Sequence, residues 1–459
     1  MVLVLTVVIL QSISFSNYAL TTKTTNIIYG SAPYLTFDGG RTRVTNTEAL
    51  LRISLSDGRT FTPTTNNSRD NPIVLPVIGQ SFNDIGMLVP TDTDSIALSS
   101  LIGTPYNYWG DDDGDGQGVN GVTATGSLNL SIVDRWNYPV ARNKVLDICS
   151  APYKLTLSNT SGRLTTRYGI PNESRFNAGN ATYYINPKTL SAICFVRPLA
   201  VGFDFGGLSD DIYNNDKGFL PQSVTPSSYG LNFPTTGAHN LFFDLWFGGV
   251  SQALSWAPVS HGGITATITP YSNTNVRVTL TGPVVTDPNQ RQSENPDSIG
   301  RPSLPQTFEL VGRDSSGNAV VKYGFELKQW FVNRGNYAST HSSIESWCNK
   351  IGGYRMPKVM DLTNATCQGE GSNADCQGAV GATPSSPDNR YRRHIGTGLI
   401  SEWGRMDYYA NAYFTGDYAT QDRRVGSSRA SFYTVSAYYG DLYSREYASS
   451  TFSGLCVYP

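Results

Sequence analysis

A short acidic run holds the side chains whose spacing best suits metal chemistry. In Asp111-Asp-Asp-Gly-Asp-Gly116, oxygen donors alternate at Asp111, Asp113 and Asp115, and Gly116 stands at the sixth position. This pattern is typical of the opening of a calcium loop, because alternate side chains converge while the glycine makes the sharp turn. The twelfth position is Val122 and not a bidentate glutamate, so calcium would need a carboxylate from elsewhere. The alternative is an acidic, solvated turn; if calcium does bind, we expect it to be a structural ion.

Tyrosine and arginine recur through the last part of the chain, from residue 331 to residue 459. These side chains carry interface hot spots because they bury a large area at a low cost in conformational entropy. They outnumber what a core of this size needs, so we expect some of them to face solvent and bind a ligand. The alternative is that a good part of them fill the fold, as we expect for Trp347 and Trp403. The candidate ligand-binding residues are Tyr408, Tyr409, Tyr413, Arg423, Arg424, Arg429, Tyr438, Tyr439, Tyr443 and Arg445.

The residue types needed for catalysis do not occur together in any recognisable motif. Hydrolytic serine chemistry needs a base near the nucleophile. No Gly-x-Ser-x-Gly turn occurs, and the histidines lie in unrelated surroundings at His239, His261, His341 and His394. Nothing singles out a carboxylate pair for glycoside hydrolysis, and no Cys-x-x-Cys or cysteine–histidine cluster suggests zinc. The sequence therefore favours a protein that is not an enzyme and requires no cofactor.

The composition is that of an exported β-protein. Only 15% of the 459 residues are charged, while Gly, Ser, Thr, Asn and Tyr are abundant. A formal net charge of −2 provides no basic field for nucleic acid, so we expect no nucleic-acid partner. The chain is also too long for one ordinary domain.

The cysteines are even in number, which fits disulfides in an oxidising compartment. A cysteine near each end of the last module suggests a bond that ties its start to its last strand. The alternative is reduced, buried thiols, and the sequence leaves other pairings open. The expected disulfides are Cys149–Cys194, Cys348–Cys456 and Cys367–Cys376.

The amino end is an apolar run from Val2 to Leu10, followed by small residues at Ser14 and Ser16. A run of this kind is typical of a signal peptide and is too short to span a bilayer. No Lys or Arg precedes this run, although a signal peptide usually has one there. We would expect this absence if the chain begins inside a longer signal. A buried strand is the alternative.

The elements that position these residues are predicted to be mostly strands. Residues 264–269 and 275–281 alternate with period two, and residues 50–55 and 59–62 flank Asp57-Gly58, which is a strong hairpin signal. We therefore expect a mainly β fold with tandem immunoglobulin-like β-sandwiches. In the last module, short helices at 342–351 and 358–363 should precede alternating strands.

The chain is predicted to comprise five segments, and the first β module should end near Asp147, where Cys149 and Pro152 mark a junction. The segments are a signal peptide at residues 1–19, a β-rich immunoglobulin-like domain with the acidic loop at 20–147, a β-sandwich at 148–240, an immunoglobulin-like sandwich at 241–330 and the last module at 331–459.

Several motifs of the last module agree with one known family. They are Trp347-Cys348, Gly353-Tyr-Arg-Met-Pro357, Asp361-Leu-Thr-Asn364, Ser401-Glu-Trp-Gly404 and Cys456-Val457. They resemble the C-terminal adhesion domain of enterobacterial exoproteins related to the intimin and invasin system, and the resemblance continues upstream through residues 229–237 and 304–324. It implies a C-type-lectin-like α+β fold for residues 331–459. The chain departs from the family at Tyr418-Ala-Thr-Gln-Asp422, where a Tyr-Trp-Thr-Ser segment is expected, so the ligand face has diverged.

The resemblance implies an exported adhesin. The Glu-Pro-Asn or Gln-Pro-Asp loop of calcium-dependent sugar binding is absent from the module, which favours a protein ligand. We expect a secreted or cell-surface protein of a Gram-negative bacterium whose C-terminal domain binds a host-cell protein receptor. The alternatives are a secreted lectin that binds glycans, and an exoprotein that binds an intimin-like outer-membrane barrel of the same bacterium.

Overall fold

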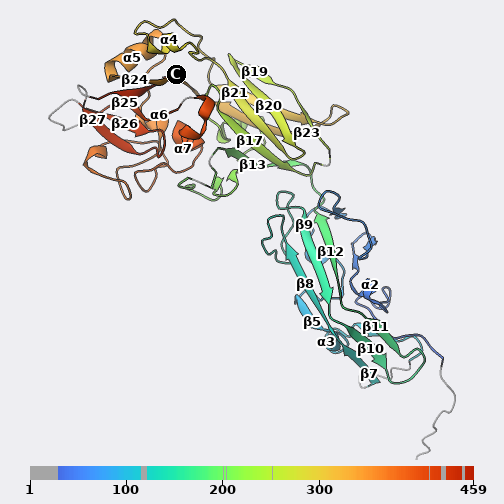
Figure 1. Cartoon of the computed structure of the whole chain (residues 1–459). Coiled ribbons are helices and arrows are strands. Elements are labelled where there is room, and N and C mark those ends of the chain that lie inside the picture. Colours follow the sequence, from blue (N-terminus) through green and yellow to red (C-terminus); the bar gives the residue numbers. More distant parts are fainter. Residues whose placement is uncertain are drawn as a thin grey trace, which may run out of the picture. The chain divides into compact units, whose positions relative to one another are not determined.

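The computed structural model describes residues 29–114, 121–199, 201–202, 204–250, 252–412, 414–424, 431–446 and 450–459. Within these residues the protein is mainly β, as predicted, and it divides into two compact units (Figure 1). The first unit comprises residues 1–146 and 150–188, and the second comprises residues 147–149 and 189–459. The predicted signal peptide at residues 1–19 lies outside the described residues.

A five-stranded sheet in the order β4-β12-β9-β8-β5 organises the first unit (Figure 1). Along β9 every second residue is buried, because one face of the sheet packs on the core. The strands are β4 (Ile73–Val74), β5 (Ser95–Ala97), β8 (Ser127–Val133), β9 (Tyr153–Asn159) and β12 (Gly179–Asn186).

Three smaller sheets complete the first unit, in the orders β11-β10-β7, β1-β6 and β2-β3. The β2–β3 hairpin is the one predicted around Asp57-Gly58, with Ile53 opposite Phe61. The strands are β1 (Tyr34–Leu35), β2 (Ile53–Ser54), β3 (Thr60–Phe61), β6 (Trp109–Gly110), β7 (Val122–Thr125), β10 (Gly162–Thr166) and β11 (Glu173–Phe176).

The second unit begins with a β-sandwich. A seven-stranded sheet (β14-β15-β13-β17-β21-β20-β19) faces a three-stranded sheet (β18-β22-β23), and Phe243 of one meets Phe325 of the other with ring centres 5.8 Å apart. This is the predicted immunoglobulin-like architecture. The strands are β13 (Ala192–Pro198), β14 (Tyr213–Asn214), β15 (Gly218–Phe219), β17 (Phe242–Gly248), β18 (Ser255–Trp256), β19 (Val259–His261), β20 (Ile264–Ser272), β21 (Asn275–Thr281), β22 (Gln306–Arg313) and β23 (Ala319–Leu327).

The C-terminal domain is a six-stranded sheet in the order β16-β24-β28-β25-β26-β27 with short helices around it. Helix α5 (His341–Lys350) begins after Thr340, whose side chain accepts a hydrogen bond from Ser343 N–H. It buries Ile344, Trp347 and Cys348, because positions three and four apart share one helix face. The strands are β16 (Thr236–Ala238), β24 (Gln329–Ser339), β25 (Asp417–Arg423), β26 (Ser431–Ser436), β27 (Leu442–Glu446) and β28 (Phe452–Tyr458).

The helices found in the described residues are all short. Helices α5 and α6 confirm the predictions at 342–351 and 358–363, and no helix of the described residues is long and apolar enough to cross a membrane. The α-helices besides α5 are α2 (Thr47–Leu50), α3 (Leu98–Leu101), α4 (Pro288–Gln292), α6 (Val359–Leu362) and α7 (Leu399–Trp403). The 3-10 helices are η1 (Phe82–Asp84), η3 (Pro226–Leu231), η4 (Ala374–Cys376), η5 (Met406–Tyr408) and η6 (Ala410–Ala412).

The structure divides the chain differently from the predicted domains. Strands β8 and β9 pair in antiparallel fashion across the predicted boundary at residue 147, so residues 153–186 complete the sheet of the first unit. Strand β16, from the end of the predicted 148–240 domain, pairs in parallel with β24 and places Ala238 opposite Phe331. The boundary near residue 147 was predicted from Cys149 and Pro152, and such local signals carry no information about strand pairing.

The three disulfides have the predicted pairings. Cys348 in α5 is bonded to Cys456 in β28, 108 residues later. The other two are Cys149–Cys194 and Cys367–Cys376.

Candidate functional site

The sandwich and the C-terminal domain share one hydrophobic core. Trp330 of β24 lies against Gly282, where an added Cβ would come within 2.6 Å of the indole ring. The Trp330 indole N–H donates to Pro283 O at 3.0 Å. Phe233 and Trp403 meet with ring centres 5.0 Å apart. The contact between the two parts is therefore a packed interior, and the C-terminal domain is positioned by the sandwich.

Glu402 of α7 is a buried carboxylate at this contact. Its oxygens accept hydrogen bonds from the N–H and hydroxyl groups of Thr235 and Thr236 at 2.6 to 3.1 Å. They also accept from Gly396 N–H at 2.8 Å. A charged group away from water is tolerated only when donors surround it, so Glu402 fixes α7 to the segment that leads into β16.

Arg393 forms a second buried link between the same two parts. Its Nε donates to Asp204 Oδ2 at 2.5 Å, and the two side chains are 0% and 2% exposed. One terminal nitrogen donates to Glu402 O at 2.6 Å, and the other donates to Leu199 O at 3.1 Å. The Tyr213 hydroxyl donates to Asp204 at 3.0 Å. We call Asp204, Thr235, Thr236, Arg393 and Glu402 the junction network.

Exposed aromatic side chains gather around Arg405. Its guanidinium carbon lies 4.6 Å from the ring centre of Tyr408 and 6.0 Å from those of Tyr438 and Tyr439. Tyr408 and Tyr439 are 41% and 47% exposed. Asp407 pairs with Arg405 at 2.8 Å, and its hydrogen bond raises the pKa of the Arg405 guanidinium. The cation is thus held in place with aromatic faces around it.

The cluster continues from Tyr439 to Phe205, whose ring centres are 5.8 Å apart. Arg390 covers Phe205 at 4.8 Å from the ring centre and pairs with Glu370 at 2.7 Å. We define the aromatic–arginine patch as Phe205, Arg390, Arg405, Tyr408, Tyr438 and Tyr439.

A groove of about 470 Å³ adjoins the patch, with Tyr408 as one of its walls. Arg277 covers Phe242 at 4.1 Å from the ring centre and pairs with Asp244 at 2.8 Å. The groove lining therefore includes two aromatic rings and the carboxylate of Asp244, which Arg277 pairs with. The remaining lining residues are Arg197, Pro198, Leu199, Val201, Phe242 and Asp244.

The predicted ligand-binding residues fall into different surroundings. Tyr408, Tyr438 and Tyr439 come together in the patch. Tyr409, in contrast, is 1% exposed, and its hydroxyl accepts from Leu199 N–H at 2.8 Å. Because Tyr409 is buried, the expectation that it faces a ligand is wrong. Tyr408 and Tyr409 are adjacent and of the same residue type, so the sequence could not distinguish the exposed tyrosine from the buried one. Tyr413 and Arg429 lie outside the described residues.

Four other predicted residues lie along β25 and β27 and their ends, apart from the patch. Arg445 lies 5.6 Å from the ring centre of Tyr443. The Tyr443 hydroxyl donates to Asp441, which raises the pKa of Tyr443 to about 12. Arg424 donates to Ser444 Oγ at 2.8 Å. The guanidinium carbon of Arg423 lies 5.5 Å from the ring centre of Phe432.

Sequence reasoning missed Phe205, Arg390 and Arg405. The spacing of Arg405 and Tyr408, three residues apart in one short helical turn, is a local signal that could have indicated their contact. No local signal leads to Phe205, because it reaches the patch from a segment nearly two hundred residues away from Arg390 and Arg405.

The acidic run is only partly described. Asp113 Oδ2 accepts from Ser31 N–H at 2.5 Å, and Asp112 accepts from the Tyr34 hydroxyl at 3.0 Å and pairs with Arg43. Asp115 lies outside the described residues, and among those described no group of three or more His, Cys, Asp or Glu side chains could hold a metal ion. The structural calcium ion at Asp111, Asp113 and Asp115 stays a prediction.

No family model and no curated protein matches the chain. Among solved structures, invasin, described as a bacterial integrin-binding protein, is 12% identical with a TM-score of 0.34, over 73% of this chain and 51% of that chain. A C-terminal fragment of intimin in complex with the intimin-binding domain of the translocated intimin receptor is 13% identical with a TM-score of 0.33, over 73% and 93%. An intimin mutant from EHEC is 12% identical with a TM-score of 0.29, over 54% and 93%.

The chain spans about half the length of the invasin chain that it matches.

Proposed function

We propose that this chain is a non-enzymatic bacterial adhesin, secreted or at the cell surface, whose aromatic–arginine patch binds a protein on a host cell. The observation that carries the proposal is the pair of half-exposed rings, Tyr408 and Tyr439, held against Arg405. Tyrosine and arginine supply most of the energy in many protein interfaces. Aromatic side chains that are exposed and bind no partner would lower the solubility of the protein.

The patch is ordered before a ligand arrives. Arg390 and Arg405 are each paired with a carboxylate, and the junction network fixes Phe205 and the groove relative to the C-terminal domain. Immobilising a side chain on binding costs about 0.5–1.5 kcal/mol. Side chains that are already held avoid part of this cost, so a small patch can contribute a useful affinity.

The motif resemblance also implies a protein-directed tip. The way in which the protein is held outside the cell belongs to the same proposal: an intimin-like outer-membrane barrel of the same bacterium would export or retain it.

The test uses the full chain with the substitutions Tyr408→Ala and Tyr439→Ala together, applied to epithelial cells. The matched control replaces the exposed Tyr138 and Tyr168 of the first unit, which are 58% and 45% exposed. We expect saturable binding by the unchanged protein that resists glycosidase and is lost after protease treatment of the cells. The patch variant should bind at least about tenfold more weakly, or about 1.4 kcal/mol. Equal binding by the patch and control variants would reject the patch.

A secreted lectin is the second candidate, and the groove favours it. Tyr408 and Phe242 offer aromatic faces, and Arg277 with Asp244 offers hydrogen-bonding groups beside them. This combination suits a sugar ring. Loss of cell binding after glycosidase, together with a glycan-array response that Tyr408→Ala abolishes, would favour this candidate over a protein receptor.

A further inference from the structure

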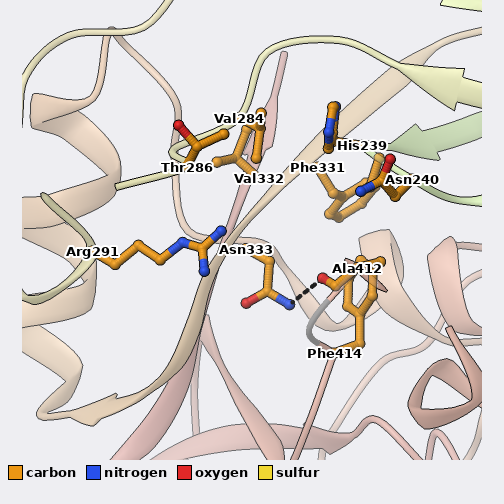
Figure 2. Close-up of a pocket in the computed structure, with 11 residues that line it drawn as sticks. His239, Asn240, Val284, Thr286, Arg291, Phe331, Val332, Asn333, Ala412 and Phe414 are labelled. Atoms are coloured by element: carbon orange, nitrogen blue, oxygen red, sulfur yellow. Dashed lines mark hydrogen bonds between the residues drawn. The ribbon is translucent and has the colours of Figure 1, made fainter. Parts of the chain in front are cut away.

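A separate pocket lies between the sandwich and the C-terminal domain (Figure 2), and it shares no lining residue with the patch or the groove. Its volume is about 300 Å³, which is at the small end of ligand sites. The floor comes from β24 and the segment near η6, and the rim comes from the ends of β16 and β21 and from α4. The lining residues are Ala238, His239, Asn240, Val284, Thr286, Arg291, Phe331, Val332, Asn333, Ala412 and Phe414.

The floor is closed and the rim is accessible. Phe331 and Phe414 line the pocket but are only 1% and 2% exposed, so they form its closed apolar floor. His239 and Arg291 are partly exposed, and Thr286 at the mouth is exposed. A small molecule could therefore enter past Thr286 and lie against the aromatic floor.

Arg291 gives the pocket a positive charge in a fixed orientation. Its Nε donates to Val285 O at 2.7 Å, and its own carbonyl oxygen accepts from Arg334 Nε at 2.7 Å. Gly335 has no Cβ, and an added one would come within 3.2 Å of the Arg291 side chain. Figure 2 shows the guanidinium directed across the pocket toward Asn333. The planar fork of a guanidinium matches the two oxygens of a carboxylate.

His239 adds a neutral donor on the opposite side (Figure 2). Its Nδ1 accepts from Gly282 N–H at 3.3 Å, which places the ring proton on Nε2. Burial is the main cause that lowers the pKa of His239; the Gly282 hydrogen bond raises it, and the Arg291 cation lowers it. The imidazole is therefore an uncharged hydrogen-bond donor at neutral pH.

No acidic side chain is among the described residues that line the pocket. The lining thus combines one cation, uncharged polar groups from His239, Asn240, Thr286 and Asn333, and apolar surface from Phe331 and Phe414. Such a lining attracts an anion whose body is partly apolar, and it repels a cation.

We propose that this pocket binds the carboxylate group of a small organic acid, with Arg291 as the recognising cation. The carboxylate could belong to an acidic monosaccharide or to the end of a peptide, and the pocket chemistry is the same for both. A bound ligand would touch β24 and the segments that leave β16 and β21. It would therefore stabilise the contact between the sandwich and the C-terminal domain by mass action.

The experiment titrates the full chain with N-acetylneuraminic acid, glucuronic acid and an acetylated dipeptide with a free carboxylate, each beside its methyl ester or amide. Calorimetry gives the dissociation constant, and thermal unfolding gives the shift in Tm. The variants are Arg291→Gln, which removes the cation, and Thr286→Trp, which blocks the mouth from an exposed position. Arg313→Gln, an exposed arginine on β22, is the matched control.

We expect at least one free carboxylate to bind with a dissociation constant of about 1 mM or below. Its ester or amide should bind at least about tenfold more weakly, and both pocket variants should cause a similar loss while Arg313→Gln does not. Whether the sugar or the peptide binds identifies the source of the carboxylate. The proposal is overturned if no probe binds up to about 10 mM, if the neutral analogues bind equally, or if Thr286→Trp, with unchanged Tm, binds normally.

Discussion

The junction network and the aromatic–arginine patch lie in one unit and use the same residue types in opposite surroundings. In the junction network, Arg393 is 0% exposed and gives its donors to Asp204 and to two carbonyl oxygens. In the patch, the Arg405 side chain is 26% exposed, is paired with Asp407 and lies among tyrosine rings. The tyrosines repeat the contrast, because Tyr409 is 1% exposed and its neighbour Tyr408 is 41% exposed.

Residue type alone therefore does not tell whether an arginine or a tyrosine of this unit supports the fold or is available to a ligand. The partner that buries Arg393 is Asp204, 189 residues away in the sequence. The partner of Arg405 is two residues away. Side chains with distant partners hold the two parts together, and side chains with local partners stay accessible. Substitutions in matched pairs, one from the junction network and one from the patch, test this contrast.

Arg393→Met should give the largest effect. Removing one partner of a buried ion pair leaves Asp204 charged and without its cation, which costs about 3–5 kcal/mol in the free energy of unfolding. The matched change Arg405→Met removes a partly exposed pair, whose side chains are 26% and 20% exposed, and should cost about 0–1 kcal/mol. Urea unfolding of the full chain, followed by tryptophan fluorescence, measures both. If Arg393→Met and Arg405→Met lower the free energy of unfolding by similar amounts, the junction network and the patch do not differ in their contribution to stability.

Glu402→Gln should give the next largest effect. The amide keeps one acceptor oxygen but turns an NH2 group toward the N–H and hydroxyl donors of Thr235 and Thr236. We expect a loss of about 2–3 kcal/mol in the free energy of unfolding. Glu370→Gln, which changes a side chain that is 67% exposed, is the control and should cost about 0–1 kcal/mol. Thermal unfolding of both variants checks this, and an unchanged Tm for Glu402→Gln would contradict it.

Tyr409→Phe and Tyr408→Phe compare adjacent residues. Tyr409 loses the hydroxyl that accepts from Leu199 N–H and donates to Trp403 O, so a buried donor is left unsatisfied at a cost of about 1–2 kcal/mol. Tyr408→Phe at the surface should stay within about 0.5 kcal/mol. Denaturant midpoints at constant slope distinguish the two. A larger loss for Tyr408→Phe would mean that the patch also supports the fold.

Much of the fold could be predicted because its signals are local. Period-two alternation marked β20 and β21, the Asp57-Gly58 turn marked the β2–β3 hairpin, and a short helix was predicted at 342–351, where α5 lies. The pairings of the cysteines were also predicted. The domain boundaries were not predicted as the structure has them, because β16 joins a sheet whose other strands begin some ninety residues later. Such a pairing leaves no trace in composition.

The candidate site was predicted only in part. The abundance of tyrosine led to Tyr408, Tyr438 and Tyr439, but Tyr409 has the same type and setting in the sequence and is buried by Leu199 and Phe242. The pocket near Arg291 was not predicted at all. Its lining comes from four separate stretches of the chain, so neither spacing nor motif could reveal it.

His341 adds a smaller, pH-dependent contribution in the buried interior of the C-terminal domain. Its ring stacks on Phe432 with centres 3.7 Å apart, and its Nε2 is hydrogen-bonded to Thr420 O at 2.9 Å. Burial lowers the pKa of His341; the Thr420 contact and Glu345 raise it, and Arg423 lowers it. The unfolded imidazole takes up a proton near about pH 6.5, while the folded one does so only at lower pH. Stability should therefore fall as the pH falls through this window.

The test compares urea unfolding at about pH 7.5 and about pH 5.5, on either side of the ordinary imidazole pKa. The unchanged protein should be less stable at the lower pH. His341→Gln keeps a donor for Thr420 O but cannot take up the proton, so its loss of stability on acidification should be smaller. Part of the loss should remain, because burial also lowers the pKa of His239. The exposed His261, changed to Gln, is the control. If His341→Gln and His261→Gln show the same pH dependence, burial of His341 has no energetic consequence. The contrast between buried and exposed side chains would then be confined to the junction network.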